Sequence, residues 1–118
     1  MHEPIAIHVY PSSQRRDVTI MELRGQLDSI TSSEVEKNLE KLLDSERWRI
    51  VVDLKNITYV SSAGWGTFMG MLKEIKINQG DLKLAGISDE VMDVFKLLEI
   101  DSFLPTYETA SEAVLSFA

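Results

Sequence analysis

The chain has 118 residues, 44% of them hydrophobic, and a formal net charge of -7 at pH 7. This length suffices for one domain with a buried core, here residues 1–118, and leaves no room for a second. The charge argues against a nucleic-acid partner, because phosphate backbones are bound mainly by clustered basic residues, whereas Arg15, Arg16, Arg47, Arg49 and the lysines lie scattered along the chain.

Membrane insertion and secretion also find no support in the sequence. No apolar run approaches the roughly 20 residues that cross a bilayer, so we expect no membrane partner. The first ten residues have neither a basic start nor a long apolar stretch, and the chain contains no cysteine. The expected compartment is therefore the cytoplasm.

The first half of the chain predicts a hairpin, a helix and a buried strand. Residues Ile5 to Tyr10 and Val18 to Leu23 alternate apolar and polar and flank a Pro-Ser-Ser turn signal. Thr31 and Glu34 then have capping-box spacing ahead of apolar residues at helical intervals, which predicts an amphipathic helix. The β-branched run from Arg49 to Leu54 is typical of a buried strand.

The second half alternates helices with strands. We expect a helix over Ser62 to Ile77, a strand through Leu82 to Ala85, a helix opened by Ser88, a short edge strand at Phe103-Leu104, and a last helix after Thr109. The element order is β-β-α-β-α-β-α-β-α. It predicts an α/β fold with a mixed, mostly parallel sheet of about five strands and about four helices.

The segment Tyr59 to Gly66 is the most informative part of the chain. It reads Tyr-Val-Ser-Ser-Ala-Gly-Trp-Gly and sets two serines between a buried strand and a glycine-rich helix. A serine there can cap the helix, or it can carry a phosphate that the free N–H groups of the helix would stabilise. The residues alone leave both roles open.

Enzyme chemistry has little support. The two histidines, His2 and His8, have no metal-ligand spacing around them, so we expect no metal and no cofactor. Val60 stands where the nucleophile-elbow motif requires a glycine, two positions before Ser62, and no histidine downstream could serve as a base. Phosphate-binding glycine motifs are missing as well, so the chain is expected not to be an enzyme.

One face of the predicted helix carries few side chains. Ser62, Gly66 and Gly70 lie four residues apart and share this face with Lys73. Such a stripe could let a partner's backbone come close, or it could admit a neighbouring helix or loop of the same domain. Trp65 could be an exposed partner anchor, but the periodicity favours the core.

At this point the residues resemble a known family. The segment Asp53 to Gly66 looks like the signature of the STAS domain, the module shared by anti-sigma-factor antagonists and sulfate-transporter tails. Leu23 to Asp28 resembles the family's L-x-G-x-L-D segment, Gly86 to Leu97 its third helix, and Tyr107 to Ala113 its final turn and helix. The resemblance therefore implies a STAS fold over nearly the whole chain.

The resemblance also implies roles for the serines. In stand-alone antagonists the motif is usually D-S-[ST]-G-L, and the serine after the aspartate is phosphorylated. Aligning on Gly64 puts Ser61 at the aspartate and Ser62 at the phosphorylated serine, with Ser61 as the alternative acceptor. The motif, the glycine stripe and an acidic position that the family places near the serine together predict these partner-binding residues: Asp28, Ser61, Ser62, Gly64, Trp65, Gly66 and Gly70.

The function that this resemblance implies is that of an anti-sigma factor antagonist in a partner-switching circuit. The unphosphorylated domain would bind an anti-sigma serine kinase of the GHKL type, phosphorylation at Ser62 would release it, and a metal-dependent serine phosphatase would restore binding. Ser61, Ala63 and Trp65 depart from the family pattern and leave the partner's identity open. The alternatives are a non-sigma interaction module, in which Ser62 only caps the helix, and a small-ligand binder with a pocket at the helix start.

Overall fold

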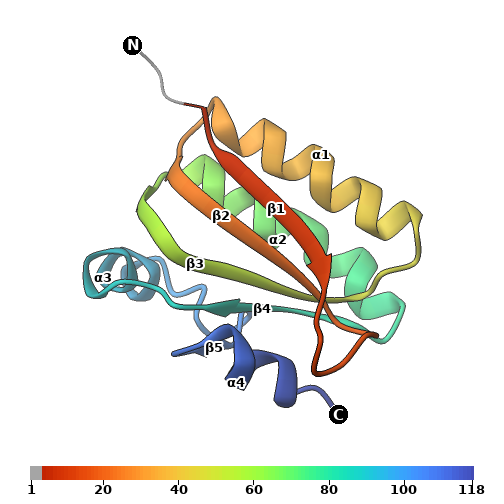
Figure 1. Cartoon of the computed structure of the whole chain (residues 1–118). Helices are drawn as coiled ribbons and strands as arrows, with labels where there is room; N and C mark the ends of the chain where they lie inside the picture. The colour runs from red at the N-terminus through yellow and green to blue at the C-terminus, as the bar shows by residue number, and fades with distance from the viewer. Residues whose placement is uncertain (1–3) are drawn as a thin grey trace.

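The computed structural model describes residues 4–118, so His2 lies outside the described part of the chain. Five strands form a single sheet in the order β1-β2-β3-β4-β5, as Figure 1 shows. The strands are β1 (Ala6–Pro11), β2 (Thr19–Leu27), β3 (Arg49–Val60), β4 (Asp81–Ala85) and β5 (Thr106–Tyr107). β1 runs antiparallel to β2, and all other neighbouring pairs are parallel.

Helices follow the parallel strands in alternation. Within residues 4–118 they are α1 (Thr31–Asp44), α2 (Ser62–Ile77), α3 (Asp89–Leu97) and α4 (Ala110–Leu115). The predicted α/β fold, with its mixed, mostly parallel sheet and its element order, is confirmed. The predicted helix starts at Ser88 and Thr109 are confirmed too, since each hydroxyl accepts a backbone N–H of the first turn.

The predicted edge strand at Phe103-Leu104 is wrong. The N–H groups of both residues bond back to the carbonyl of Ile100 in a turn, Leu104 is fully buried, and Phe103 is 56% exposed. The last strand begins only at Thr106. Two adjacent apolar residues are too short a pattern to distinguish a strand from a turn that drops one side chain into the core.

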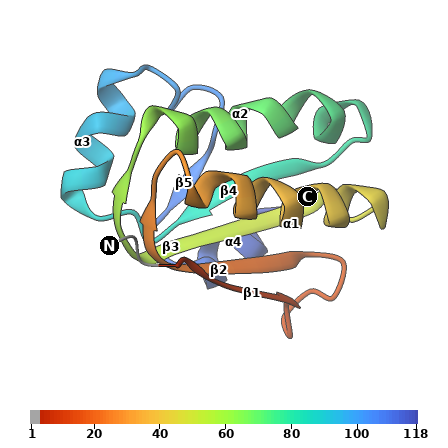
Figure 2. The same ribbon diagram turned by 90° about the horizontal axis from the view of Figure 1, so that it is seen from above.

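The two faces of the sheet are covered unequally. Helices α1 and α2 lie side by side on one face, with α3 beside the start of α2, and α4 lies on the opposite face (Figure 2). The larger core lies under α1 and α2 and includes Leu39, Leu54, Phe68, Ile75 and Phe95. The smaller core joins α4 to the sheet through Val51, Ala85, Ala113, Val114 and Phe117. The helix α2 is therefore held by the main core of the molecule.

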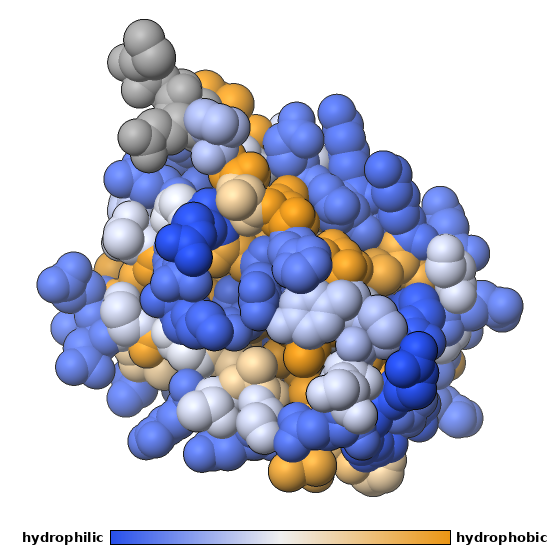
Figure 3. Space-filling view, in the orientation of Figure 1, coloured by the Kyte–Doolittle hydropathy of each residue, from blue (hydrophilic) through white to orange (hydrophobic). Residues whose placement is uncertain are grey.

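The hairpin of β1 and β2 presents a polar surface on the α4 side. Hydrophilic side chains cover most of this face (Figure 3). Tyr10 donates a hydrogen bond of 2.6 Å from its hydroxyl to Glu22 Oε1, and the His8 and Tyr10 rings lie 4.8 Å apart. Burial, together with the bond to Glu22, raises the pKa of Tyr10 to about 12. This half of the sheet is solvated on one side, as antiparallel pairs often are.

Candidate functional site

The junction between β3 and α2 is shaped by Ser61. Its backbone is extended, with φ -81° and ψ 170°, and its Oγ accepts the N–H of Gly64 at 3.2 Å. Its own N–H donates to the carbonyl of Leu27 at the end of β2, at 2.8 Å. Ser61 is therefore the N-cap of α2 and ties the helix start to the neighbouring strand. Of the two roles that the sequence left open, capping the helix therefore belongs to Ser61.

Ser62 lies next to the cap but has a different environment. It is the first residue of α2, its side chain is exposed, and its hydroxyl has no hydrogen-bond partner within residues 4–118. Ser62 does not cap the helix, because Ser61 fills that role. The N–H groups of Ser62 and Ala63 lie in the first turn, where a helix supplies no acceptor of its own. The hydroxyl of Ser62 is thus open to solvent beside free backbone donors.

The three glycines of α2 serve two different purposes. A Cβ built on Gly64 would lie 2.9 Å from Leu27 Cγ and 2.9 Å from Val60 Cγ1, so only a glycine lets the helix start pack this closely on the strand ends. Within the described residues 4–118, a Cβ on Gly66 or Gly70 would meet nothing within 4 Å. The alternative in which these two glycines admit another segment of the domain is therefore wrong. They lie on open surface.

Trp65 belongs to the core. It is 2% exposed, and its ring packs 6.2 Å from that of Phe68 and 5.0 Å from that of Phe95 in α3. Within residues 4–118 its buried Nε1 has no hydrogen-bond partner, a situation that generally costs about 1–3 kcal/mol. Trp65 and the buried Gly64 cannot contact a partner directly, so that part of the predicted binding surface is wrong.

Asp28 lies at the same edge of the sheet as the serines. It follows β2 directly, and Leu27 pairs in register with Val60 at the end of β3. Its Oδ1 accepts the N–H of Thr31 at 2.9 Å and so orders the start of α1. The capping box predicted for Thr31 and Glu34 is wrong, because the carboxylate of Asp28 takes over the role of the cap. The structure brings Asp28 and Ser61 to neighbouring strand ends, as parallel pairing requires.

Five exposed positions between the start of α2 and Lys73 lie on one side of the helix, and we call this surface the docking face. It consists of Ser62, Ala63, Gly66, Gly70 and Lys73. No acidic residue lies in the first turn of the helix, so nothing of negative charge on α2 itself crowds Ser62. The docking face is a strip of exposed backbone with few side chains, and it begins at the free hydroxyl.

A groove between α1 and α2 borders the far end of the docking face. It has a volume of about 300 Å³, Gly70 lines it, and its walls carry Glu40, Asp44 and Glu74. Sequence reasoning missed these carboxylates because two of them lie about 30 residues before Gly70. Their helical spacing, with Glu40 and Asp44 four residues apart, was the available signal.

Residues 4–118 contain no cluster of three or more histidine, cysteine or acidic side chains arranged to hold a metal ion. The helices found in this range are too short or too polar to cross a membrane.

Comparison with known proteins gives a consistent result. A family model described as STAS domain matches residues 10–113. The anti-sigma-B factor antagonist of Staphylococcus aureus is 31% identical over 84 residues, which cover 71% of this chain and 78% of that protein. An anti-sigma factor antagonist from Mycobacterium paratuberculosis has a solved structure with a TM-score of 0.84 at 17% identity, covering 95% of this chain and 92% of the other. The Bacillus cell fate determinant SpoIIAA, solved in its phosphorylated form, has a TM-score of 0.69 at 18% identity, covering 92% and 96%.

Proposed function

We propose that this chain, which belongs to the STAS domain family, acts as an anti-sigma factor antagonist in a partner-switching circuit. In its unphosphorylated form it binds an anti-sigma serine kinase of the GHKL type and so frees a sigma factor. The kinase phosphorylates Ser62, which ends the binding, and a metal-dependent serine phosphatase restores it. The name of the curated relative supports the antagonist role, and the phosphorylated neighbour supports a phosphoswitch on this fold.

The main observation behind this proposal is that the two serines have different environments: Ser61 caps the helix, whereas the hydroxyl of Ser62 is exposed. A kinase must reach the hydroxyl that it modifies, and the Ser62 side chain is exposed and has no bond to break first. Ser61 is half-buried, and its Oγ is occupied by the N–H of Gly64. Phosphorylation of Ser61 would remove the cap, whereas phosphorylation of Ser62 leaves the cap in place. Ser62 is therefore the proposed acceptor.

A phosphate on Ser62 is expected to leave the fold intact. It adds about -1.5 to -2 charges, and free N–H groups at a helix N-terminus stabilise such a charge by about 0.3–1 kcal/mol. The modified residue points to solvent, away from the core that Trp65 and Phe68 form. The switch must therefore act on the partner rather than on the stability of this domain.

The docking face explains how the phosphate would disrupt binding. Gly66 and Gly70 leave open space above the helix, so a partner can come into close contact with the backbone just beyond Ser62. A dianion in such a contact loses its water and finds no cation unless the partner supplies one. A loss of about 2.7 kcal/mol weakens binding a hundredfold, and one unpaired charge can account for it.

The acidic groove indicates what the partner presents. Glu40, Asp44 and Glu74 line the groove together with Gly70, at the far end of the docking face from Ser62. The chain as a whole carries a net charge of -7. If basic side chains of the kinase bound in this groove, the surface of the kinase would lie over Gly70. Such opposite charges increase the rate of association and become less effective as salt is added.

The test compares four proteins in two measurements: the parent, its phosphorylated form, Ser62→Ala and Ser61→Ala. Thermal melting reports the fold, and titration with the GHKL-type anti-sigma kinase of the source organism reports binding. We expect the phosphorylated form to melt like the parent and to bind at least a hundredfold more weakly. Ser62→Ala should bind like the parent and accept no phosphate.

The controls separate this mechanism from its rivals. Phosphate found by mass spectrometry on Ser61 rather than Ser62 would overturn the assignment of the acceptor. Equal binding by the parent and its phosphorylated form would rule out the switch, and unfolding of the phosphorylated form would rule out action through the partner. Protein from its own cells that never carries phosphate would favour an interaction module without phosphorylation.

A further inference from the structure

Four of the five arginines of the chain gather at the end of the sheet opposite Ser62. Arg15 and Arg16 lie between β1 and β2, whereas Arg47 lies between α1 and β3 and Arg49 is the first residue of β3. Arg15 and Arg49 both contact Asp17, at 2.8 and 3.7 Å, and Arg47 contacts the backbone of Arg16. For these four residues the expectation of scattered basic charge is wrong, because folding brings the two segments together.

Two of these arginines differ from Arg15 and Arg49 in their surroundings. Within residues 4–118 neither Arg16 nor Arg47 forms an ion pair, although the chain has 19 acidic side chains and 12 basic ones. Two guanidinium groups held near each other repel, and an anion placed between them relieves that repulsion. An anion between the two guanidinium groups would therefore gain favourable electrostatic contacts with both.

The guanidinium group of Arg47 is held in a fixed position. Its Nε donates to Thr19 Oγ1 at 2.8 Å, and its Nη2 donates to the carbonyl of Arg16 at 2.8 Å. Thr19 is only 3% exposed, so this anchor belongs to the rigid body of the sheet. Within residues 4–118, Arg47 Nη1 forms no hydrogen bond. Arg47 is thus a prearranged donor, and binding an anion would cost it little conformational entropy.

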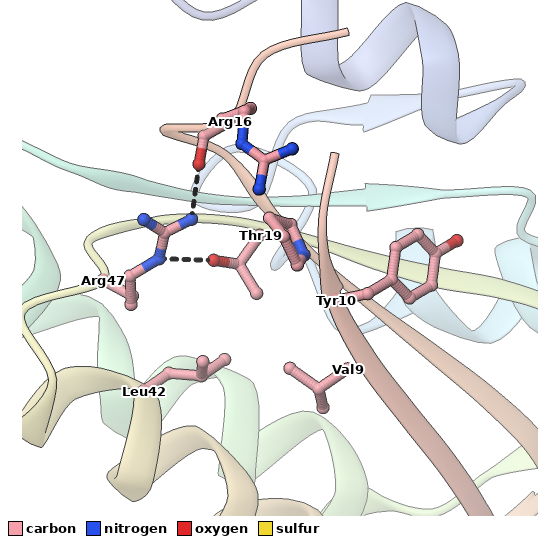
Figure 4. Close-up of a pocket in the computed structure, with 7 residues that line it drawn as sticks. Val9, Tyr10, Arg16, Thr19, Leu42 and Arg47 are labelled. Atoms are coloured by element: carbon pink, nitrogen blue, oxygen red, sulfur yellow. Dashed lines mark hydrogen bonds between the residues drawn. The ribbon is translucent and has the colours of Figure 1, made fainter. Parts of the chain in front are cut away.

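These arginines border a pocket with two chemically different ends. The pocket has a volume of about 360 Å³, and its lining includes Arg16, Arg47, Val9 and Leu42. Figure 4 shows the two guanidinium groups at one end and the side chains of Val9 and Leu42 at the other. Sites for small molecules are commonly of this size, with apolar walls and a few charged groups that orient the ligand.

We propose that this pocket binds a small phosphate monoester whose alcohol part is apolar. The phosphate lies against Arg16 and Arg47, since guanidinium groups match phosphate oxygens in geometry and charge. The apolar part lies between Val9 and Leu42. The twelve residues of β3 lie between the pocket and Ser62, and from the first to the last of them the strand spans roughly 36 Å at ~3.3 Å per step. The site is therefore independent of the proposed phosphoswitch.

The test uses phenyl phosphate as the probe, with inorganic phosphate and phenol, the alcohol component, as its two separated parts. NMR titration of the whole chain follows the backbone amides of Val9, Thr19, Leu42 and Arg47. We expect these amides to shift with phenyl phosphate, at least tenfold weaker binding of inorganic phosphate, and no measurable binding of the alcohol. Equal affinity for phenyl phosphate and inorganic phosphate would contradict the role of the apolar end.

The matched variants are Arg16→Gln and Arg24→Gln, which remove the same charge from two exposed arginines. Arg24 lies in β2, about 17 Å along the strand from Thr19. We expect Arg16→Gln to weaken phenyl phosphate binding about tenfold and Arg24→Gln to change it less than twofold. Similar losses from both variants would show that only the general charge of the surface attracts the probe, and would overturn the site.

Arg47 needs a more conservative variant, because it also joins two segments of the fold. Arg47→Lys keeps the charge but loses the paired hydrogen-bond geometry, and we expect it to weaken binding about fivefold while the protein remains folded. If Arg16→Gln and Arg47→Lys both bind the probe like the parent, Arg47 serves only to hold the loop and no site exists.

Discussion

The inner and outer faces of α2 both contain glycine, but for opposite reasons. On the inner face, a Cβ on Gly64 would lie 2.9 Å from side-chain atoms of Leu27 and Val60, so the absence of a side chain permits the packing of the domain itself. On the outer face Gly66 and Gly70 face open space. Each costs the helix about 1 kcal/mol relative to alanine without any packing benefit inside the domain. A residue that weakens its own helix at an open surface indicates a role outside the domain.

The largest effect is expected on the inner face, where Trp65 joins α2 to α3. Trp65→Ala removes the contacts with Phe68 and Phe95 and leaves a cavity, which should lower the free energy of unfolding by about 3–5 kcal/mol. Urea denaturation, monitored by circular dichroism, measures this change in the free energy of unfolding. Trp65→Phe keeps the ring contacts and removes the unpaired Nε1–H, so it should lose less than half as much. A loss below about 1 kcal/mol for the alanine variant would show that α2 is not anchored through this residue.

A smaller loss is expected where the helix meets the strand ends. Gly64→Ala places a methyl group against Leu27 and Val60 and should destabilise the fold by about 1–3 kcal/mol, the usual effect of overfilling a packed core. The same denaturation experiment on Gly66→Ala is the matched control, since that methyl group enters empty space. If Gly64→Ala is as stable as the parent, the strand ends can move apart, and the inner and outer glycines are not as different as the structure indicates.

The sequence predicted the inner face of α2 well and the outer face only in part. Helical periodicity placed Trp65 in the core, because burial of an apolar stripe is a local property of the pattern. Whether Gly66 and Gly70 meet a neighbour depends on where other helices lie, which no local pattern records. The roles of the two serines were likewise undecidable from the residues alone, because either one could cap the helix until the register of the strand end was known.

The arginine pocket also could not be predicted from local sequence patterns, because its residues are far apart in the sequence. The bases Arg16 and Arg47 lie 31 positions apart in sequence and share a hydrogen bond in the structure. The overall fold could be predicted because strands and helices alternate in an order that few topologies satisfy. Sites formed by the meeting of two loops could not, since their residues have no common spacing.

The two serines provide a finer comparison at the head of the helix. Ser61→Ala removes the cap on Gly64 N–H and should lower the free energy of unfolding by about 1 kcal/mol. Ser62→Ala removes an exposed hydroxyl without a partner and should change it by less than about 0.5 kcal/mol. Thermal unfolding of both variants in the same buffer gives the difference. Equal losses would mean that Ser62 supports the fold after all, and would weaken its assignment as a residue reserved for modification.

The smallest effect on stability is expected on the outer face, and it has the opposite sign. Gly66→Ala and Gly70→Ala should each raise the free energy of unfolding by about 0.4–1 kcal/mol, because alanine favours the helix and its methyl group meets no other atom.

The same methyl groups would hold a partner's backbone away from the docking face. An overfilled contact costs about 1–3 kcal/mol, so binding of the anti-sigma kinase should weaken at least fivefold. Lys73→Ala, on the same face but with a flexible side chain, is the control and should change binding less than threefold. A glycine-to-alanine variant that is more stable than the parent and binds the kinase equally well would contradict this prediction. It would show that the partner does not approach over Gly66 and Gly70.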